Sequence, residues 1–464
     1  MLELPLNGLW SLPGPDSGRT REVHGALVEQ GGRWILKLHD FFAPDVSLGE
    51  GRWPQIHGVA ENGDHLTLAD CFVVRGPSRG GAGGTARRAN DAEIFVGMIA
   101  YGVHLGRDER RIASLDVVFQ GLNKWYGHAG LSQRLTARGV RFDYRASGDI
   151  RCRAGDLAVT FSNRARMRPV SRWSRGIDFG LDIVVSVRRQ RLMALEELPD
   201  LLHPLHCLVS VCCRANVAVA KLAAQVKERR SGPWDLRTGL VYVRPALPGV
   251  PVPSDPRMFD REFLGDLPAV VRAWHASFPR LESGVHACLE HLGDGSGDVY
   301  ARVADHVTFV ESFLRGDPSM QYMPAQDFQA FLDDLSGFLE QRIQDTELRK
   351  VLQGRAHMSN TYSLRTLVNR FVDRHRPLLN RFLSNRKIKK CVYYAVIIRN
   401  GIAHARLAPE LRGRMDRVMA ADLFMGLLVA LCLLECMGLE KDPIELCGHP
   451  YFKDINDKLQ SLDI

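Results

Sequence analysis

Residues 192–222, LMALEELPDLLHPLHCLVSVCCRANVAVAKL, divide this chain, because the spacing of apolar residues changes there. Within this stretch apolar side chains recur three and four residues apart, with interruptions at Pro199 and Pro204, which is the period of a helix. The chain before it alternates apolar and polar residues, and the chain after residue 260 keeps the helical period. We therefore predict an α+β protein, with a β-rich N-terminal half and an α-helical C-terminal half.

Residues 1–190 contain short runs in which apolar and polar side chains alternate, as they do in half-buried strands. Asn62-Gly63-Asp64 between two such runs is a strong hairpin signal. Many short strands at close spacing favour a sandwich or a barrel. The glycine-rich basic segment 76–90, GPSRGGAGGTARRAN, lacks the order of a phosphate-binding loop and is predicted to be a surface loop. The clearest strand runs are RWILKLHDFF, DHLTLADCFVV, AEIFVGMIAYGVHL, SLDVVFQGL, DLAVTFSN and GLDIVVSVRR.

The rest of the chain divides into residues 191–260 and 261–464. We predict a helical segment followed by a proline-rich connector with one short strand in the first part. The second part is predicted to be wholly helical, and Asn385 is a candidate N-cap. The expected helices are 262–277, 299–315, 325–344, 363–372, one starting near 385, and 420–438.

The composition describes a soluble protein of 464 residues, long enough for two to four domains. Lys and Arg (61) exceed Asp and Glu (53) by eight, which permits a polyanionic partner without requiring one. The ten cysteines lack metal-finger spacing and are predicted to be buried free thiols, as in a reducing cytoplasm. No signal peptide begins the chain, and the apolar run 423–439 is predicted to be a buried core helix, so we expect a cytoplasmic protein without a membrane partner.

The window 389–406, KKCVYYAVIIRNGIAHAR, carries the strongest chemical signal. An apolar helix runs into Arg399 and Asn400, and His404 stands five positions after Arg399, about 7.5 Å along a continued helix. RNA can be cut without a metal when its own 2′-hydroxyl attacks the adjacent phosphate. His404 would transfer the proton near neutral pH, and Arg399 would bind the phosphate with its planar fork. Taken alone, the spacing also fits a helix-end arginine and a surface histidine.

The same residues resemble the R-N-x3-H signature of the HEPN superfamily of α-helical ribonucleases. The N-terminal half is similar to that of ApeA-like proteins, which are implicated in anti-phage defence by abortive infection. The resemblance implies that Arg399 and His404 are catalytic, with Asn400 between them, and that two HEPN domains dimerise around one cleft. It also implies a polar residue on an earlier helix, for which Glu311 is the candidate; a solvated helix charge is the alternative. One departure is that Ile397-Ile398 stand where several members have a polar or acidic residue. The N-terminal positions that carry the likeness are Gly8, Leu9, Trp10, Gly25, Leu27, Gly121, Leu122 and Trp125.

A basic stretch from Arg365 to Arg406, which includes Arg374 and the motif itself, is predicted to contact the RNA backbone; a solvated helix face is the alternative. Tyr393 and Tyr394 are candidates for stacking on bases, or else core residues. His203 and His206 are predicted to be structural, and no metal or cofactor is expected. The predicted RNA-binding residues are Arg386, Lys387, Lys389, Lys390 and Arg406.

These observations predict a metal-independent endoribonuclease, with tRNA as a candidate substrate, a homodimeric state and a phage-derived trigger. The alternative is a non-catalytic protein that dimerises and binds nucleic acid or another partner. A metal-dependent nuclease is disfavoured because the sequence shows no clustered carboxylates.

Overall fold

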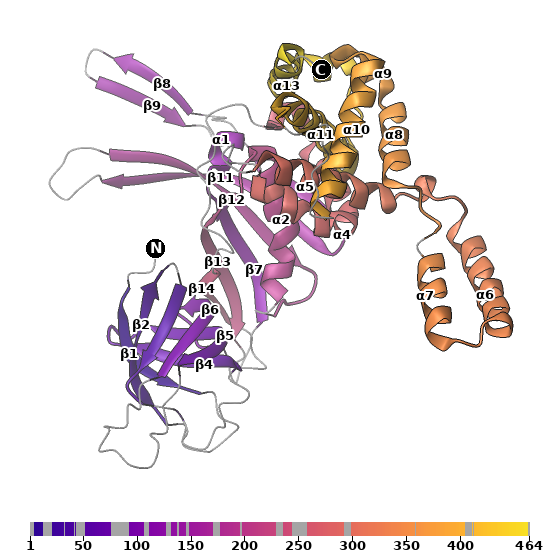
Figure 1. Ribbon diagram of the computed structural model, residues 1–464. Coiled ribbons are helices and arrows are strands. Elements are labelled where there is room, and N and C mark those ends of the chain that lie inside the picture. Colours follow the sequence, from indigo (N-terminus) through magenta and orange to yellow (C-terminus); the bar gives the residue numbers. More distant parts are fainter. Residues whose placement is uncertain are drawn as a thin grey trace. The chain divides into compact units, whose positions relative to one another are not determined.

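The computed structural model divides the chain into two compact units. The first comprises residues 1–209 and 217–252, and the second residues 210–216 and 253–464. Figure 1 shows the elements of both units. The structure describes residues 4–12, 21–31, 33–40, 42, 52–75, 92–105, 111–126, 131–136, 139–144, 148–169, 177–194, 197–228, 235–243, 258–291, 298–357, 359–403, 411 and 413–462.

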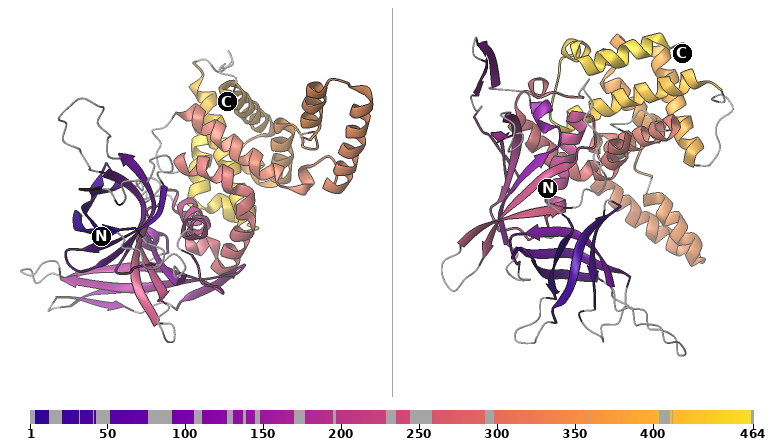
Figure 2. Two further views of the ribbon diagram at one scale, coloured as in Figure 1. Left: turned by 90° about the horizontal axis from the view of Figure 1, so that it is seen from below. Right: turned by 90° about the vertical axis from the view of Figure 1, so that its left-hand side faces the viewer.

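A closed six-stranded barrel begins the first unit. Its strands pair in the order β6-β3-β2-β1-β4-β5, and β5 pairs again with β6 to close the ring. All of these pairings are antiparallel, and Figure 2 shows the barrel from two further directions. The predicted turn at Asn62-Gly63-Asp64 joins β4 to β5. The strands are β1 (Leu6–Ser11), β2 (Val23–Gln30), β3 (Arg33–Leu38), β4 (Arg52–Ala60), β5 (His65–Arg75) and β6 (Ala92–Tyr101).

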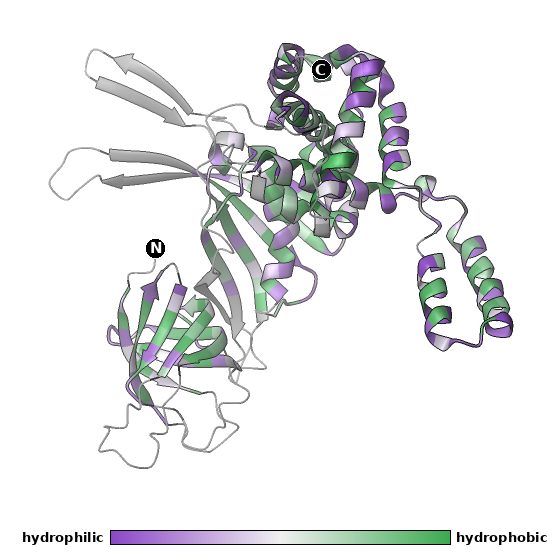
Figure 3. Cartoon of the chain, viewed as in Figure 1, coloured by the Kyte–Doolittle hydropathy of each residue, from purple (hydrophilic) through white to green (hydrophobic). Residues whose placement is uncertain are grey.

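Trp10 fills the barrel core, and two glycines lie close to it. Its side chain is fully buried, and its indole Nε1 donates to the backbone oxygen of Gly25 at 3.1 Å. A Cβ at Gly58 would lie 2.3 Å from the Trp10 ring, and one at Gly25 would lie 2.4 Å from the Lys37 oxygen. Neither position can therefore hold a larger residue without displacing its neighbour. Figure 3 shows the alternation of hydrophobic and hydrophilic residues along these strands.

An open antiparallel sheet continues from the barrel through the pairing of β14 with β6. Its order is β10-β11-β12-β7-β13-β14, and β8 pairs only with β9 among the described strands. Helix α1 (Leu122–Tyr126) follows β7 and carries the buried Trp125. The strands are β7 (Arg111–Phe119), β8 (Leu131–Thr136), β9 (Gly139–Tyr144), β10 (Ile150–Ala154), β11 (Leu157–Pro169), β12 (Ile177–Arg189), β13 (Val219–Glu228) and β14 (Asp235–Val243).

The fold class is confirmed, since a β-rich half that includes a barrel precedes a helical half. The stretch 192–222 is less uniform than its spacing suggested. Helix α2 (Leu198–Cys213) forms there, but Val219 already belongs to β13. The spacing misled because β13 pairs with β7, more than a hundred residues earlier, and that pairing overrides local preference. The glycine-rich segment 76–90 lies outside the described residues.

Helices α4, α5, α10 and α11 form the centre of the second unit, with α5 in contact with each of the other three. Helix α5 coincides with the predicted segment 299–315, whereas α7, α9, α12 and α13 were not predicted. Helices α6 and α7 pack against each other. The helices are α3 (Arg261–Leu264), α4 (Leu267–His291), α5 (Val299–Arg315), α6 (Ala325–Arg342), α7 (Thr346–His357), α8 (Leu364–Arg374), α9 (Arg376–Phe382), α10 (Asn385–Ala403), α11 (Met415–Cys436), α12 (Pro443–Gly448) and α13 (Pro450–Ser461).

Helix α11 is the core helix of this unit. Among the described residues it is the one helix long and apolar enough to cross a membrane, but 78% of its most apolar window is buried inside the unit. This burial is what a soluble core helix shows. The predicted thiols also behave as expected, because all ten cysteines are free and nine are buried. Burial raises the pKa of Cys391 to about 12, which keeps it a thiol.

Candidate functional site

Helix α10 carries Arg399 to the edge of the helical core. Cys391, Ala395 and Ile398 recur at helical spacing and are buried, so this face packs against the bundle. Arg399 comes directly after this face, and 35% of its side chain remains exposed. The backbone NH of Lys387 approaches the Ser384 hydroxyl at 3.4 Å, so Ser384 takes the capping place predicted for Asn385.

Glu311 of helix α5 contacts Arg399 directly. The Nη2 of Arg399 donates to Oε2 of Glu311 at 3.1 Å, although the two residues are 88 positions apart in sequence. The carboxylate is 12% exposed, and its other oxygen accepts from Nη2 of Arg315 at 2.7 Å and from Nε at 3.0 Å. Arg315 also donates to the hydroxyl of Thr361. Two guanidinium groups therefore share one carboxylate, and the trio carries a net positive charge.

The arrangement suits an anion at Arg399. Glu311 holds one corner of the guanidinium, and the exposed part of the side chain faces solvent. An arginine fixed in this way can present its remaining N–H groups to a phosphate without first losing side-chain freedom. Nη1 also lies 3.4 Å from Oδ1 of Asn400, whose side chain is exposed.

Two of the predicted site residues come after the last residue of α10. Helix α10 ends at Ala403, and His404 and Arg406 lie outside the described residues. The distance between Arg399 and His404 therefore stays a prediction. The structure brings together Arg399, Glu311 and Asn400 from the predicted site, and it adds Arg315, which the sequence did not single out.

The basic residues predicted to contact RNA occupy the first two turns of α10. Arg386 and Lys389 are exposed, and Lys387 and Lys390 are half-buried. Nine residues separate Lys390 from Arg399, so about 13.5 Å of helix lies between them. Cations near a helix N-terminus oppose the helix dipole, and a bound polyanion would offset this cost.

The structure favours the core alternative for Tyr394 and corrects the prediction for Arg374. Tyr394 is buried and packs under Arg417 at 5.4 Å, so it is a core residue and does not stack on bases. Tyr393 lies 5.7 Å below the guanidinium of Arg365. Arg374 belongs to the basic stretch in sequence, but it is held between the carboxylates of Asp317 and Glu435.

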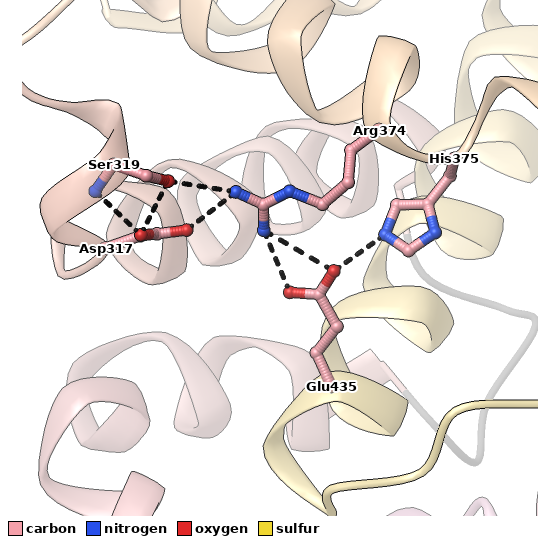
Figure 4. A network of polar contacts seen from close by, with 5 residues as sticks. All are labelled: Asp317, Ser319, Arg374, His375 and Glu435. Atoms are coloured by element: carbon pink, nitrogen blue, oxygen red, sulfur yellow. Dashed lines mark hydrogen bonds and ion pairs between the residues drawn. The ribbon is translucent and has the colours of Figure 1, made fainter.

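That network was not predicted, and Figure 4 shows its five residues. Arg374 Nη2 donates to Asp317 at 2.8 Å, and His375 Nε2 lies 2.8 Å from Oε1 of Glu435. Burial alone raises the pKa of Asp317, but hydrogen bonds from Arg374 and Ser319 outweigh it and lower that pKa. Arg374, His375 and Glu435 also line a cavity of about 970 Å³ in the second unit.

The comparisons with known families cover most of the chain. Residues 5–244 match the model described as ApeA N-terminal domain 1, and residues 305–443 match the Apea-like HEPN model. The second match includes Glu311, Arg399 and His404. The comparisons with curated proteins and with solved structures found no match.

Proposed function

The chain belongs to the ApeA family and carries its HEPN domain at the C-terminus, and on that premise we propose that it is a metal-independent endoribonuclease. HEPN domains are typically ribonucleases, and the family function is nuclease-based defence. The observation that carries the proposal is the contact between Arg399 and Glu311, because it fixes a half-exposed guanidinium at the end of α10. We propose RNA as substrate, with tRNA as the first candidate, in abortive infection against phage.

The proposed reaction needs two groups from the R-N-x3-H motif. His404 accepts the proton of the RNA 2′-hydroxyl, and the 2′-oxygen forms a bond to the adjacent phosphorus while the bond to the 5′-oxygen breaks. Arg399 binds the non-bridging oxygens, where negative charge grows in the transition state. A protonated His404 of the second subunit donates to the leaving 5′-oxygen. The products are a 2′,3′-cyclic phosphate and a 5′-hydroxyl.

Glu311 and Asn400 have supporting roles in this proposal. Glu311 positions the guanidinium of Arg399, because it accepts one of its N–H groups at 3.1 Å. Asn400 lies four residues before His404, so a continued helix would place the two side chains on one face and let the amide orient the imidazole. The cations Arg386, Lys387 and Lys389 would bind the RNA backbone, together with Lys390 and Arg406.

The quaternary state follows from the same premise. HEPN domains commonly dimerise, and we propose a homodimer in which Arg399 and His404 of both chains face a single cleft. A phage-derived trigger would release the nuclease, because an unrestrained ribonuclease would harm the host cell. Light scattering after size-exclusion chromatography gives the molar mass and tests the dimer directly.

The test of catalysis is RNA cleavage with EDTA present. Wild type, Arg399→Ala and His404→Ala are incubated with total tRNA and a lysate of phage-infected cells as the source of the trigger. Arg355→Ala serves as the matched control because Arg355 is an exposed arginine on α7. We expect cleavage by wild type and the control, with 2′,3′-cyclic ends, and a loss of about 10²- to 10³-fold in the other two. Equal cleavage by all four proteins would refute the assignment.

A non-catalytic protein that binds nucleic acid is the second candidate. The observation in its favour is that the basic residues of α10 lie about 13.5 Å or more from Arg399 along the helix. It predicts that RNA is bound but not cut, and that Arg399→Ala leaves the binding constant unchanged. A filter-binding assay beside the cleavage assay separates the two candidates.

A further inference from the structure

The part of helix α2 that belongs to the first unit brings three metal-ligating side chains together. His203, His206 and Cys207 stand at positions i, i+3 and i+4, which share one face of a helix. One ligand atom from each lies within 4.8 Å of the other two. His203 and His206 were predicted to be structural from the sequence, and the structure adds the sulfur of Cys207, one helical turn from His203, beside them.

The spacing of these atoms is close to what a tetrahedral metal needs. Zinc bonds of about 2.3 Å to sulfur and 2.0–2.1 Å to nitrogen place the two ligand atoms about 3.5 Å apart. The Sγ of Cys207 lies 3.7 Å from each ring nitrogen of His203. Because the two distances are equal, neither ring nitrogen points at the sulfur as the ring stands, and metal binding would turn the His203 ring until one nitrogen and the sulfur face a common centre.

The second histidine already has the outer contact that metal-bound histidines use. Nε2 of His206 lies 2.6 Å from the backbone oxygen of Val217. A carbonyl can only accept, so Nε2 carries the hydrogen, and a metal would bind His206 through Nδ1. Val217 comes just before β13, so a metal on His206 would join helix α2 to the start of that strand.

We propose that His203, His206 and Cys207 bind one zinc ion, with a fourth position for water or another donor. Imidazole and thiolate ligands select zinc over magnesium or calcium, which prefer oxygen. Cys207 is fully buried, and a buried thiolate is costly unless a cation lies beside it. Binding releases the thiol proton to solvent. The site belongs to the first unit and does not depend on the proposed nuclease activity.

The test measures zinc on the full chain. Wild type, Cys207→Ala, His203→Ala and Cys212→Ala are loaded with zinc, dialysed and analysed by mass spectrometry of the metal. Cys212 is the matched control, because it is a fully buried cysteine of the same helix outside the cluster. We expect about one zinc per chain in wild type and Cys212→Ala, and at least a tenfold loss in the other two.

The absorption spectrum of the wild-type protein loaded with cobalt provides a test that does not depend on whether the variants fold. A bound thiolate produces an intense charge-transfer band in the near ultraviolet and four-coordinate cobalt gives strong visible bands, so both are expected. Zinc held equally by Cys207→Ala would mean adventitious binding and would overturn the proposal. So would wild type that retains no zinc, or a cobalt complex without the thiolate band.

Discussion

Helix α5 carries an arginine–carboxylate pair near each of its ends, and the two pairs differ in almost every physical respect. Near its start, Arg302 binds Asp422 of α11. Near its end, Glu311 binds Arg399 of α10. Both pairs join α5 to another core helix, so a count of salt bridges would treat them alike.

The first pair is closed. The side chains of Arg302 and Asp422 are 15% and 8% exposed. Nε and Nη2 of the arginine donate hydrogen bonds to both carboxylate oxygens at 2.7–2.9 Å. Nδ1 of His306 lies 3.5 Å from the same carboxylate. The hydrogen bonds to Asp422 raise the pKa of Arg302, so its guanidinium stays charged. Such a pair holds helices together and has little capacity left for a ligand.

The second pair is open on one side. Glu311 is nearly buried, and its carboxylate oxygens accept hydrogen bonds from two arginines. Arg399 contacts it through one nitrogen and is 35% exposed. Both oxygens of Glu311 therefore have hydrogen-bond donors, and the guanidinium of Arg399 has further N–H groups that face solvent. Exposure and unfilled donor capacity therefore distinguish Arg399 from Arg302, and the presence of an ion pair does not.

The largest effect on stability is expected at the closed pair. Asp422→Ala leaves the Arg302 guanidinium buried without its partner, which should lower the free energy of unfolding by about 3–5 kcal/mol. Denaturant titration followed by circular dichroism measures the loss. Asp416→Ala is the control, because Asp416 is an aspartate of the same helix that is 33% exposed and forms a looser pair. Its effect should stay under about 1 kcal/mol, and equal losses for the two variants would remove the distinction.

The open pair should show the opposite pattern. Arg399→Lys keeps the charge but loses the planar fork, so we expect RNA cleavage to fall about 10²-fold. Stability should change by less than about 0.5 kcal/mol, as for most half-exposed positions. Arg355→Lys on α7 provides the control for both measurements. A variant that melts early yet still cuts RNA would place Arg399 with the structural arginines.

A smaller effect is expected from Glu311→Gln, which keeps an acceptor for Arg399 but removes the charge. We expect kcat to fall about tenfold with little change in KM, since the guanidinium is held less firmly in the transition state. Glu311→Asp keeps the charge and should recover part of the lost rate. If Glu311→Gln and Glu311→Asp give the same kcat and the same KM, Glu311 supports the fold and does not position Arg399.

The same comparison shows what the sequence could foresee. The bounds of α5 are determined by nearby residues. Asp298 caps its first turn, its apolar residues keep the helical period, and the helix ends before Gly316. The motif around Arg399 is also local. The bond between Glu311 and Arg399 spans 88 residues, so only the resemblance to HEPN domains suggested it, and nothing suggested that Arg315 would fill the other oxygen.

Misjudged features share a dependence on distant partners. Strand β13 begins inside a stretch that was predicted to be helical, and it forms because β7 pairs with it. Arg374 looked like part of an RNA-facing basic stretch until the fold brought it between Asp317 and Glu435. Charge runs read from sequence overstate the charge that solvent meets, because the sequence does not show which carboxylates neutralise them.

The smallest expected effect comes from a buried group that is best uncharged. Burial lowers the pKa of His449, more than Asp260 and Glu445 raise it, so its folded pKa lies below the unfolded value of about 6.5. Its Nδ1 accepts the Tyr451 NH at the start of α13, and this requires a deprotonated nitrogen. The stabilisation is therefore complete above pH 6.5 and is lost as the pH falls below it, because the unfolded chain takes up the proton first.

His449→Asn keeps a capping acceptor without a titratable ring, so its unfolding midpoint should depend less on pH between about 7 and 5 than that of wild type. Parallel slopes in that interval would show that His449 does not contribute to acid sensitivity.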